Sequence, residues 1–99
     1  MQQHAVGHYT SAGTQTLVAA PASGYRIKVT NLHVSAGAAG SVTVGFSATN
    51  QRVWDLAANQ SEDISALGWQ GDAATALSVT TPGTGPTDVT VDYEIEVAP

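Results

Sequence analysis

This chain of 99 residues has the length of one small domain, with 42% hydrophobic and only 11% charged residues. Its net charge is −5, and Arg26, Lys28 and Arg52 are too few to neutralise a phosphate backbone or an anionic bilayer, so we expect binding to neither nucleic acid nor membrane. The sequence has no cysteine and no apolar run of membrane-spanning length, and its first residues do not resemble a secretion signal.

The first quarter of the chain is expected to contain two short strands. Residues 4–10 (HAVGHYT) form a weak first strand, and residues 1–10 can serve either as an edge strand or as a docking arm. After a turn at 11–13, residues 14–19 (TQTLVA) are β-prone, and the Pro and Gly of 21–24 end them.

The next predicted strand, residues 25–35 (YRIKVTNLHVS), changes its apolar side partway. Ile27 and Val29 lie at odd positions, whereas the later Leu and Val lie at even positions. Alternate side chains of a strand point to opposite faces, so one extra residue at 30–31, a β-bulge, would return the apolar side to the core. The alternative is two separate strands that meet at Asn31. We favour the bulge because no Gly or Pro interrupts the segment.

The middle of the chain is predicted to continue in short strands. Residues 37–40 form a loop bracketed by glycines and 41–47 (SVTVGFS) alternate cleanly, so the strand before the loop and the strand after it are expected to form a hairpin. Residues 52–56 (RVWDL) form a short strand. The region that follows is undecided, because 61–67 (SEDISAL) can begin one helical turn, with Ser61 as its N-cap, or form a short strand.

Two more strands are predicted near the C-terminus, at 75–80 (TALSVT) and 87–97, with 83–88 (GTGPTD) as a hairpin connection. The residues expected to face inward from the last strand are Val89, Val91, Tyr93, Ile95 and Val97. About eight short strands without sustained helical periodicity predict an all-β fold. We expect one antiparallel β-sandwich domain over residues 1–99, with a jelly-roll-like arrangement.

The three histidines are the candidate metal ligands. On a strand, His4 and His8 would lie about 13 Å apart, too far to share one ion. His33 lies on the outward side of its strand, where the sequence identifies no partner. We therefore expect neither a metal site nor a bound cofactor.

Acidic residues occupy the outward side of the last strand, at positions Asp88, Asp92, Glu94 and Glu96. Paired carboxylates can perform acid–base chemistry or hold calcium, but alternating acids are also typical of the solvated face of an antiparallel strand, which we favour. Arg26 and Lys28 would pair with this face if they lie across the sheet. No nucleophile, base and orienting group can be assembled, so we expect no enzymatic activity.

Aromatic residues are the remaining candidates for contact with a partner. Trp54 alternates with Leu56 and is expected mainly in the core. Trp69, in the loop-like LGWQGD, is either an exposed anchor for a partner or a cap on an open end of the sandwich. The candidate interface residues are His4, Tyr9, Trp54 and Trp69.

Two stretches together resemble small virion proteins of tailed bacteriophages. "SGYRIKVTNLHVSAGAAGSVTVGFS" resembles a pattern in which a Gly-x-basic-Ile-x-Val strand leads to a small-residue loop and a Val/Thr strand. "ALSVTTPGTGPTDVTVDYEIEV" resembles the C-terminal strand pair of these proteins, and the two stretches cover about half of the chain. Both are strand patterns that define core positions, so no binding residues are carried over.

The resemblance implies a jelly-roll capsid decoration protein, commonly a homotrimer, that sits over contacts between major capsid proteins. Such a protein would be made in the bacterial cytoplasm and located on the capsid surface of the virion. Related sandwiches occur in head fibres, tail tubes and receptor-binding tips. The alternative function is therefore a tail-fibre or carbohydrate-binding module, in which Trp69 and Tyr9 or Tyr25 would stack on sugar rings.

Overall fold

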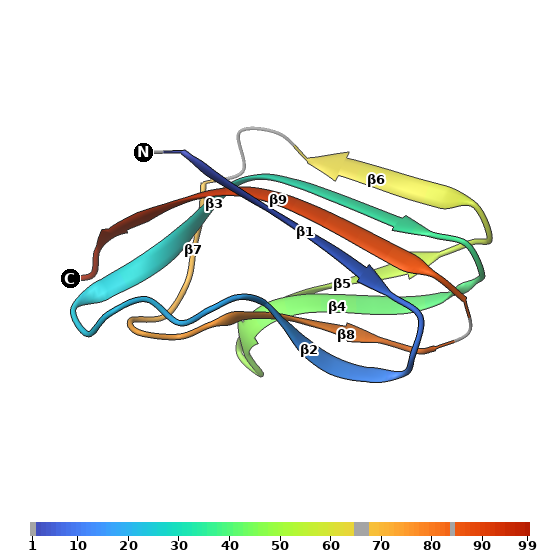
Figure 1. Ribbon diagram of the computed structural model, residues 1–99, viewed down its shortest axis with the longest axis horizontal. Helices are drawn as coiled ribbons and strands as arrows, with labels where there is room; N and C mark the ends of the chain where they lie inside the picture. The colour runs from blue at the N-terminus through green and yellow to red at the C-terminus, as the bar shows by residue number, and fades with distance from the viewer. Residues whose placement is uncertain (1, 65–67, 84) are drawn as a thin grey trace.

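The computed structural model describes residues 2–64, 68–83 and 85–99, which form two antiparallel sheets that face each other (Figure 1). Sheet A has the strand order β1-β9-β3-β6, with β7 also paired to β3, and sheet B has the order β2-β8-β4-β5. The strands are β1 (Gln3–Tyr9), β2 (Gly13–Val18), β3 (Tyr25–Ala36), β4 (Gly40–Ser47), β5 (Asn50–Leu56), β6 (Gln60–Ile64), β7 (Trp69–Gln70), β8 (Leu77–Thr81) and β9 (Thr87–Val97).

This strand order is that of a jelly roll, which confirms the predicted fold class. Apart from the two-residue β7 and the hairpin of β4 and β5 within sheet B, successive strands alternate between the sheets, so that each sheet has four strands in the order of two interlocked Greek keys. The connections after β1, β3, β5 and β8 all cross between the sheets at the same end of the molecule, on the right in Figure 1. The described part of the chain contains no helix able to cross a membrane.

The two predicted hairpins are wrong in their pairing. β3 lies in sheet A and β4 in sheet B, so the loop between them joins the two layers, and β4 pairs with β5 and β8 instead. The connection from β8 to β9 also passes between layers. The two connections meet where the Gly37 N–H donates to the carbonyl oxygen of Pro86 at 2.8 Å. An alternating pattern tells which side of a strand is buried but not which sheet the strand joins.

The predicted β-bulge is confirmed. In the pairing of β3 with β9, Val29 lies opposite Tyr93 and Asn31 lies opposite Asp92, so Thr30 is the extra residue. The Thr30 hydroxyl donates to the backbone oxygen of Asp92 at 3.0 Å. The bulge lets both halves of β3 face the core, because the buried residues of this strand are Ile27, Val29, Leu32, Val34 and Ala36.

The core lies between the two sheets, and its fully buried side chains come from β3, β4, β8 and β9. The residues predicted to face inward from the last strand all lie on the inner side of sheet A, but Val89 and Val91 are fully buried whereas Ile95 and Val97 are 37% and 71% exposed. Sheet B does not extend beneath this end of β9 (Figure 1). The undecided segment begins as strand β6, and its residues 65–67 lie outside the described residues.

Candidate interaction surfaces

The two outward faces of the sandwich differ in charge. The chain has three basic and eight acidic residues, and seven of these eleven lie on the outer side of sheet A, namely Arg26, Lys28, Asp63, Asp88, Asp92, Glu94 and Glu96. The outer side of sheet B carries only Asp55, which accepts a hydrogen bond from the Ser41 hydroxyl. We call these the charged face and the hydroxyl face, respectively.

The hydroxyl face is built from two rows of outward side chains across all four strands of sheet B. The residues at these positions alternate with buried ones such as Val42, Val44 and Val79, which fixes their outward direction. The first row is Thr14, Thr80, Thr43 and Val53, and the second is Thr16, Ser78, Gly45 and Gln51. Within the first row, the hydroxyls of Thr14 and Thr80 lie 2.7 Å apart.

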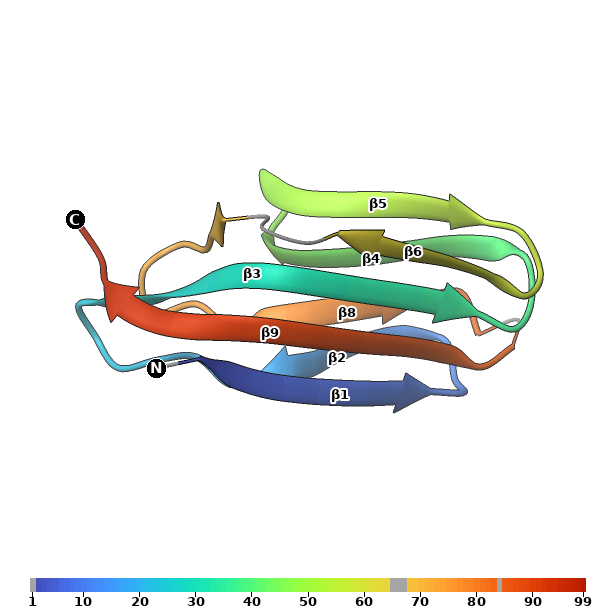
Figure 2. The same cartoon turned by 90° about the horizontal axis from the view of Figure 1, so that it is seen from above.

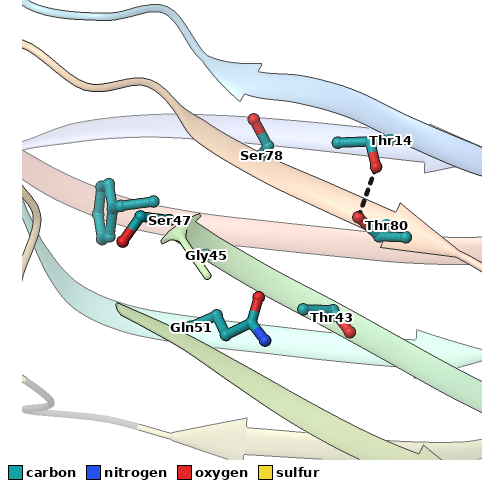
Figure 3. Close-up of a pocket in the computed structure, with 8 residues that line it drawn as sticks. Thr14, Thr43, Gly45, Ser47, Gln51, Ser78 and Thr80 are labelled. Carbon is teal, nitrogen blue, oxygen red and sulfur yellow. Dashed lines mark hydrogen bonds between the residues drawn. The ribbon is translucent and has the colours of Figure 1, made fainter. Parts of the chain in front are cut away.

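A shallow hollow of about 220 Å³ crosses this face where the side chains are small (Figure 3). Gly45 lies in this hollow beside Gln51, and a Cβ built at position 45 would come within 2.4 Å of the Gln51 Cβ. The hollow is lined by Thr14, Thr43, Gly45, Phe46, Ser47, Gln51, Ser78 and Thr80. This shape and chemistry suit a protruding uncharged group of a partner better than an ion.

On the charged face, each histidine has its own aspartate on the neighbouring strand. Nδ1 of His4 donates to Asp92 at 2.7 Å, Nδ1 of His33 donates to Asp63 at 2.9 Å, and His8 bonds to Asp88 in the same way. The structure therefore supplies a partner for His33 that the sequence did not identify. Among the described residues, no group of three or more metal-ligating side chains is placed to hold an ion.

The predicted pairing of basic residues with the last strand is confirmed for Arg26. Its Nε donates to Oε2 of Glu96 at 2.6 Å, and Gln70 donates to the same oxygen at 3.2 Å. Lys28 lies directly opposite Glu94 in the register of β3 and β9. The pair of Arg26 and Glu96 neutralises part of the charged face locally, and at its partial exposure it contributes at most about 1 kcal/mol.

The hydrogen bond from His4, and then that from Asn31, holds the pKa of Asp92 below its ordinary value. A carboxyl whose pKa is lower in the folded state adds stability above its unfolded pKa, and this contribution is lost as the pH falls through the folded value. We therefore expect the wild type to lose more stability than Asp92→Asn between about pH 5 and pH 2. Urea unfolding across this range measures the difference. A parallel loss in Asp92→Asn would contradict the assignment.

Trp69 joins the two sheets rather than standing free as an anchor. It sits in β7 at the edge of sheet A, opposite Val29, and its indole Nε1 donates to Oδ1 of Asn50 in sheet B at 2.8 Å. Its ring packs edge-to-face on Phe46 with centroids 5.1 Å apart, and the Arg52 guanidinium lies 5.4 Å from the ring centroid. Of the two predicted roles, these contacts favour the cap on an open end of the sandwich over the exposed anchor.

The other candidate interface residues occupy different places and do not form one site. Tyr9 is a core residue, 7% exposed, and burial raises the pKa of its hydroxyl. It therefore cannot serve as an exposed contact, which corrects that prediction. Trp54 is half-buried against the core, as expected, and His4 lies exposed on the charged face.

The hydroxyl face was not predicted from the sequence, although a signal for it exists. The segments SVTVGFS and LSVTT place Thr, Ser or Gly at every second position between buried residues, and TQT places Thr at two alternate positions of β2. A strand whose outward positions carry hydroxyls in place of charges differs from an ordinary solvated strand. Only the pairing of β2, β8, β4 and β5 shows that these positions join into one surface.

No family model matches this sequence, and no curated protein matches it. A solved structure described as "Bacillus endospore appendages form a novel family of disulfide-linked pili" is similar to this chain with a TM-score of 0.48 and 18% sequence identity, over 94% of this chain and 86% of that one.

Proposed function

We propose that this chain is a non-enzymatic structural protein of a tailed-bacteriophage virion, a capsid decoration protein that binds across contacts between major capsid proteins. In this proposal it is made in the bacterial cytoplasm and acts as a homotrimer on the capsid surface. The observation that carries the proposal is the separation of charge between the two faces. The hydroxyl face would lie against the capsid, and the charged face would remain in solvent.

The hydroxyl face has the properties of a surface that loses water at low cost. Charged residues are depleted from the centres of protein interfaces because removing a charge from water costs far more than removing a hydroxyl that finds a hydrogen-bond partner. Val53, which is 55% exposed in the first row, adds apolar area at the edge of this face. The face is thus suited to docking on protein.

The size of the face indicates why several copies would act together. Four strands about 4.8 Å apart and about five residues long give an area of roughly 300 Å². A stable pairwise interface buries about 800 Å² on each partner. One copy is therefore expected to bind weakly, whereas a trimer over a symmetric capsomer contact would add its contacts through multivalency.

The test compares two exposed valines on opposite faces. We expect Val53→Lys on the hydroxyl face to reduce binding to capsids by tenfold or more, because a charge would be buried at the contact. Val6→Lys should bind as the wild type does, because Val6 is 63% exposed and faces outward from sheet A. Co-sedimentation with undecorated empty capsids measures the affinities, and cryo-EM of the decorated particles locates the protein.

Two results would reject the proposal: binding to tails in place of heads, or equal effects of Val53→Lys and Val6→Lys. The alternative, a sugar-binding tail-fibre module, needs aromatic rings open to solvent. Tyr9 is buried and Trp69 is engaged by Phe46 and Asn50, which leaves Tyr25, 43% exposed. This favours the capsid role.

A further inference from the structure

The C-terminal part of β9 has a backbone edge that no strand of the described chain pairs with. β1 runs alongside β9 only as far as the pair Gln3 and Tyr93, and β9 continues to Val97 (Figure 2). The other edge of this segment is paired with the beginning of β3. The unpaired edge therefore lies on the β1 side, over residues 94–97.

The hydrogen-bond pattern identifies the backbone groups that point to this edge. The carbonyl oxygens of Tyr25 and Ile27 accept bonds from Ala74 and Gly71, so they point away from β9. The pairs that these two residues form with Val97 and Ile95 are therefore the non-hydrogen-bonded pairs of the ladder. It follows that the N–H and C=O groups of Ile95 and Val97 point outward on the β1 side, where an added strand would meet them.

The side chains beside this edge are apolar and exposed. Val97 is 71% exposed, Ile95 is 37% exposed, and Tyr25 lies directly opposite Val97 and is 43% exposed. All three lie on the inner side of sheet A by the register of β3 and β9. The connection from β2 to β3 runs below this end of the two strands in Figure 1, yet the three side chains remain partly exposed. An edge that combines outward backbone groups with uncovered apolar side chains is a template for strand addition.

The chain itself indicates which sequence suits this template. β3 already pairs with the same part of β9 on its other side, and there Tyr25, Ile27 and Val29 alternate with Arg26 and Lys28. The apolar residues share the inner side with Ile95 and Val97, and the basic residues face Glu94 and Glu96. A strand added on the free edge would likewise have Ile95 and Val97 beside it on the inner side of the sheet and Glu94 and Glu96 on the outer side. We propose that this edge binds an extended segment of a partner protein in which apolar residues alternate with Arg or Lys.

The probe is an acetylated and amidated peptide with the sequence of residues 24–29 (GYRIKV), added to the isotopically labelled full chain. We expect the amide resonances of Ile95 and Val97 to shift, and their hydrogen exchange to slow by about tenfold or more at saturation. A peptide of the same composition with its two basic residues adjacent (GYIVRK) should bind at least several-fold more weakly. Its apolar and basic residues do not alternate, so they cannot all face the apolar and the acidic side of the edge, respectively.

Val97→Pro removes an outward N–H without removing a bond to β3, and it is expected to weaken peptide binding by about tenfold. Val97→Lys should weaken it as well, whereas Val6→Lys is the control on the far part of the sheet and should leave it unchanged. The spectrum of each variant away from 94–97 reports that its fold is intact.

Three results would overturn the proposal: no shift of these amides at millimolar peptide, equal binding of both peptides, or unchanged binding by Val97→Pro. A fourth would do so too. If the resonances of Ile95 and Val97 move with protein concentration alone, the occupant is a second copy. This test is independent of capsid binding, which depends on the hydroxyl face.

Discussion

Deletion of Thr30 is expected to leave the chain folded, whereas deletion of His33 is expected to destabilise it strongly. Thr30 is the extra position in the pairing of β3 with β9, so without it the two halves of β3 pair with β9 in one unbroken ladder, and Leu32 and Val34, which are at most 2% exposed, keep their places in the core. His33 occupies a paired position, so without it either Val34 turns away from the core or the bulge is absorbed and Leu32 turns outward. Each large apolar side chain lost from the core costs about 1.5–3 kcal/mol, and a buried polar group without a partner costs several more.

The losses expected for the His33 deletion are a large part of the stability of a small domain, about 5–15 kcal/mol. Two comparisons separate the register effect from other causes. Thr30→Ala keeps the bulge and loses only the hydroxyl bonds, so it should cost about 0.5–1.5 kcal/mol. Deletion of Ala20 shortens an exposed connection and should leave the protein folded. Circular dichroism and urea unfolding measure all four variants, and a Thr30 deletion as destabilising as the His33 deletion would show that Thr30 is not the extra residue that sets the register.

Trp69→Ala is expected to lower the free energy of unfolding by about 2–4 kcal/mol. A fully buried Trp costs about 3–5 kcal/mol when truncated, and Trp69 is half-buried. The change removes the contact with Phe46 and leaves Asn50 without its donor. For a chain of this length, the melting temperature should fall by more than about 10 °C.

Trp69→Phe separates the ring from its hydrogen bond. It should retain most of the packing on Phe46 and cost only about 1 kcal/mol. Thermal and urea unfolding provide the values. If Trp69→Ala left stability unchanged and abolished binding to glycans, Trp69 would be a partner anchor, and the sugar-binding alternative would regain its main support.

The parts of the fold that the sequence predicts are those set within one strand. Alternation in β4 and β8 identifies Val42, Val44, Leu77 and Val79 as core, and all four are at most 1% exposed. The bulge is predictable because an unbroken strand that changes its apolar side has one simple local solution.

Features that depend on two strands could not be predicted in the same way. His4 pairs with Asp92 across 88 positions of sequence, and that pairing requires the order and register of sheet A. The same holds for the rows of the hydroxyl face. The exposure of Ile95 and Val97 is set by where sheet B ends, and nothing in β9 itself encodes that end. Each strand therefore specifies its own buried side, whereas the charged face and the hydroxyl face depend on how the strands are ordered and paired within the sheets.

The antiparallel pairing of β1 and β9 at the edge of sheet A also determines how this protein would respond to mechanical load. Gln3 and Val97 lie at the same end of two neighbouring strands. A force that separates them would open the hydrogen-bonded pairs in succession, as a zipper opens, and would not load all of them at once in shear. Tension between the two ends of the chain would thus peel β1 away at low force, so a particle that strains under internal pressure is better held through the broad faces of this domain than through its termini.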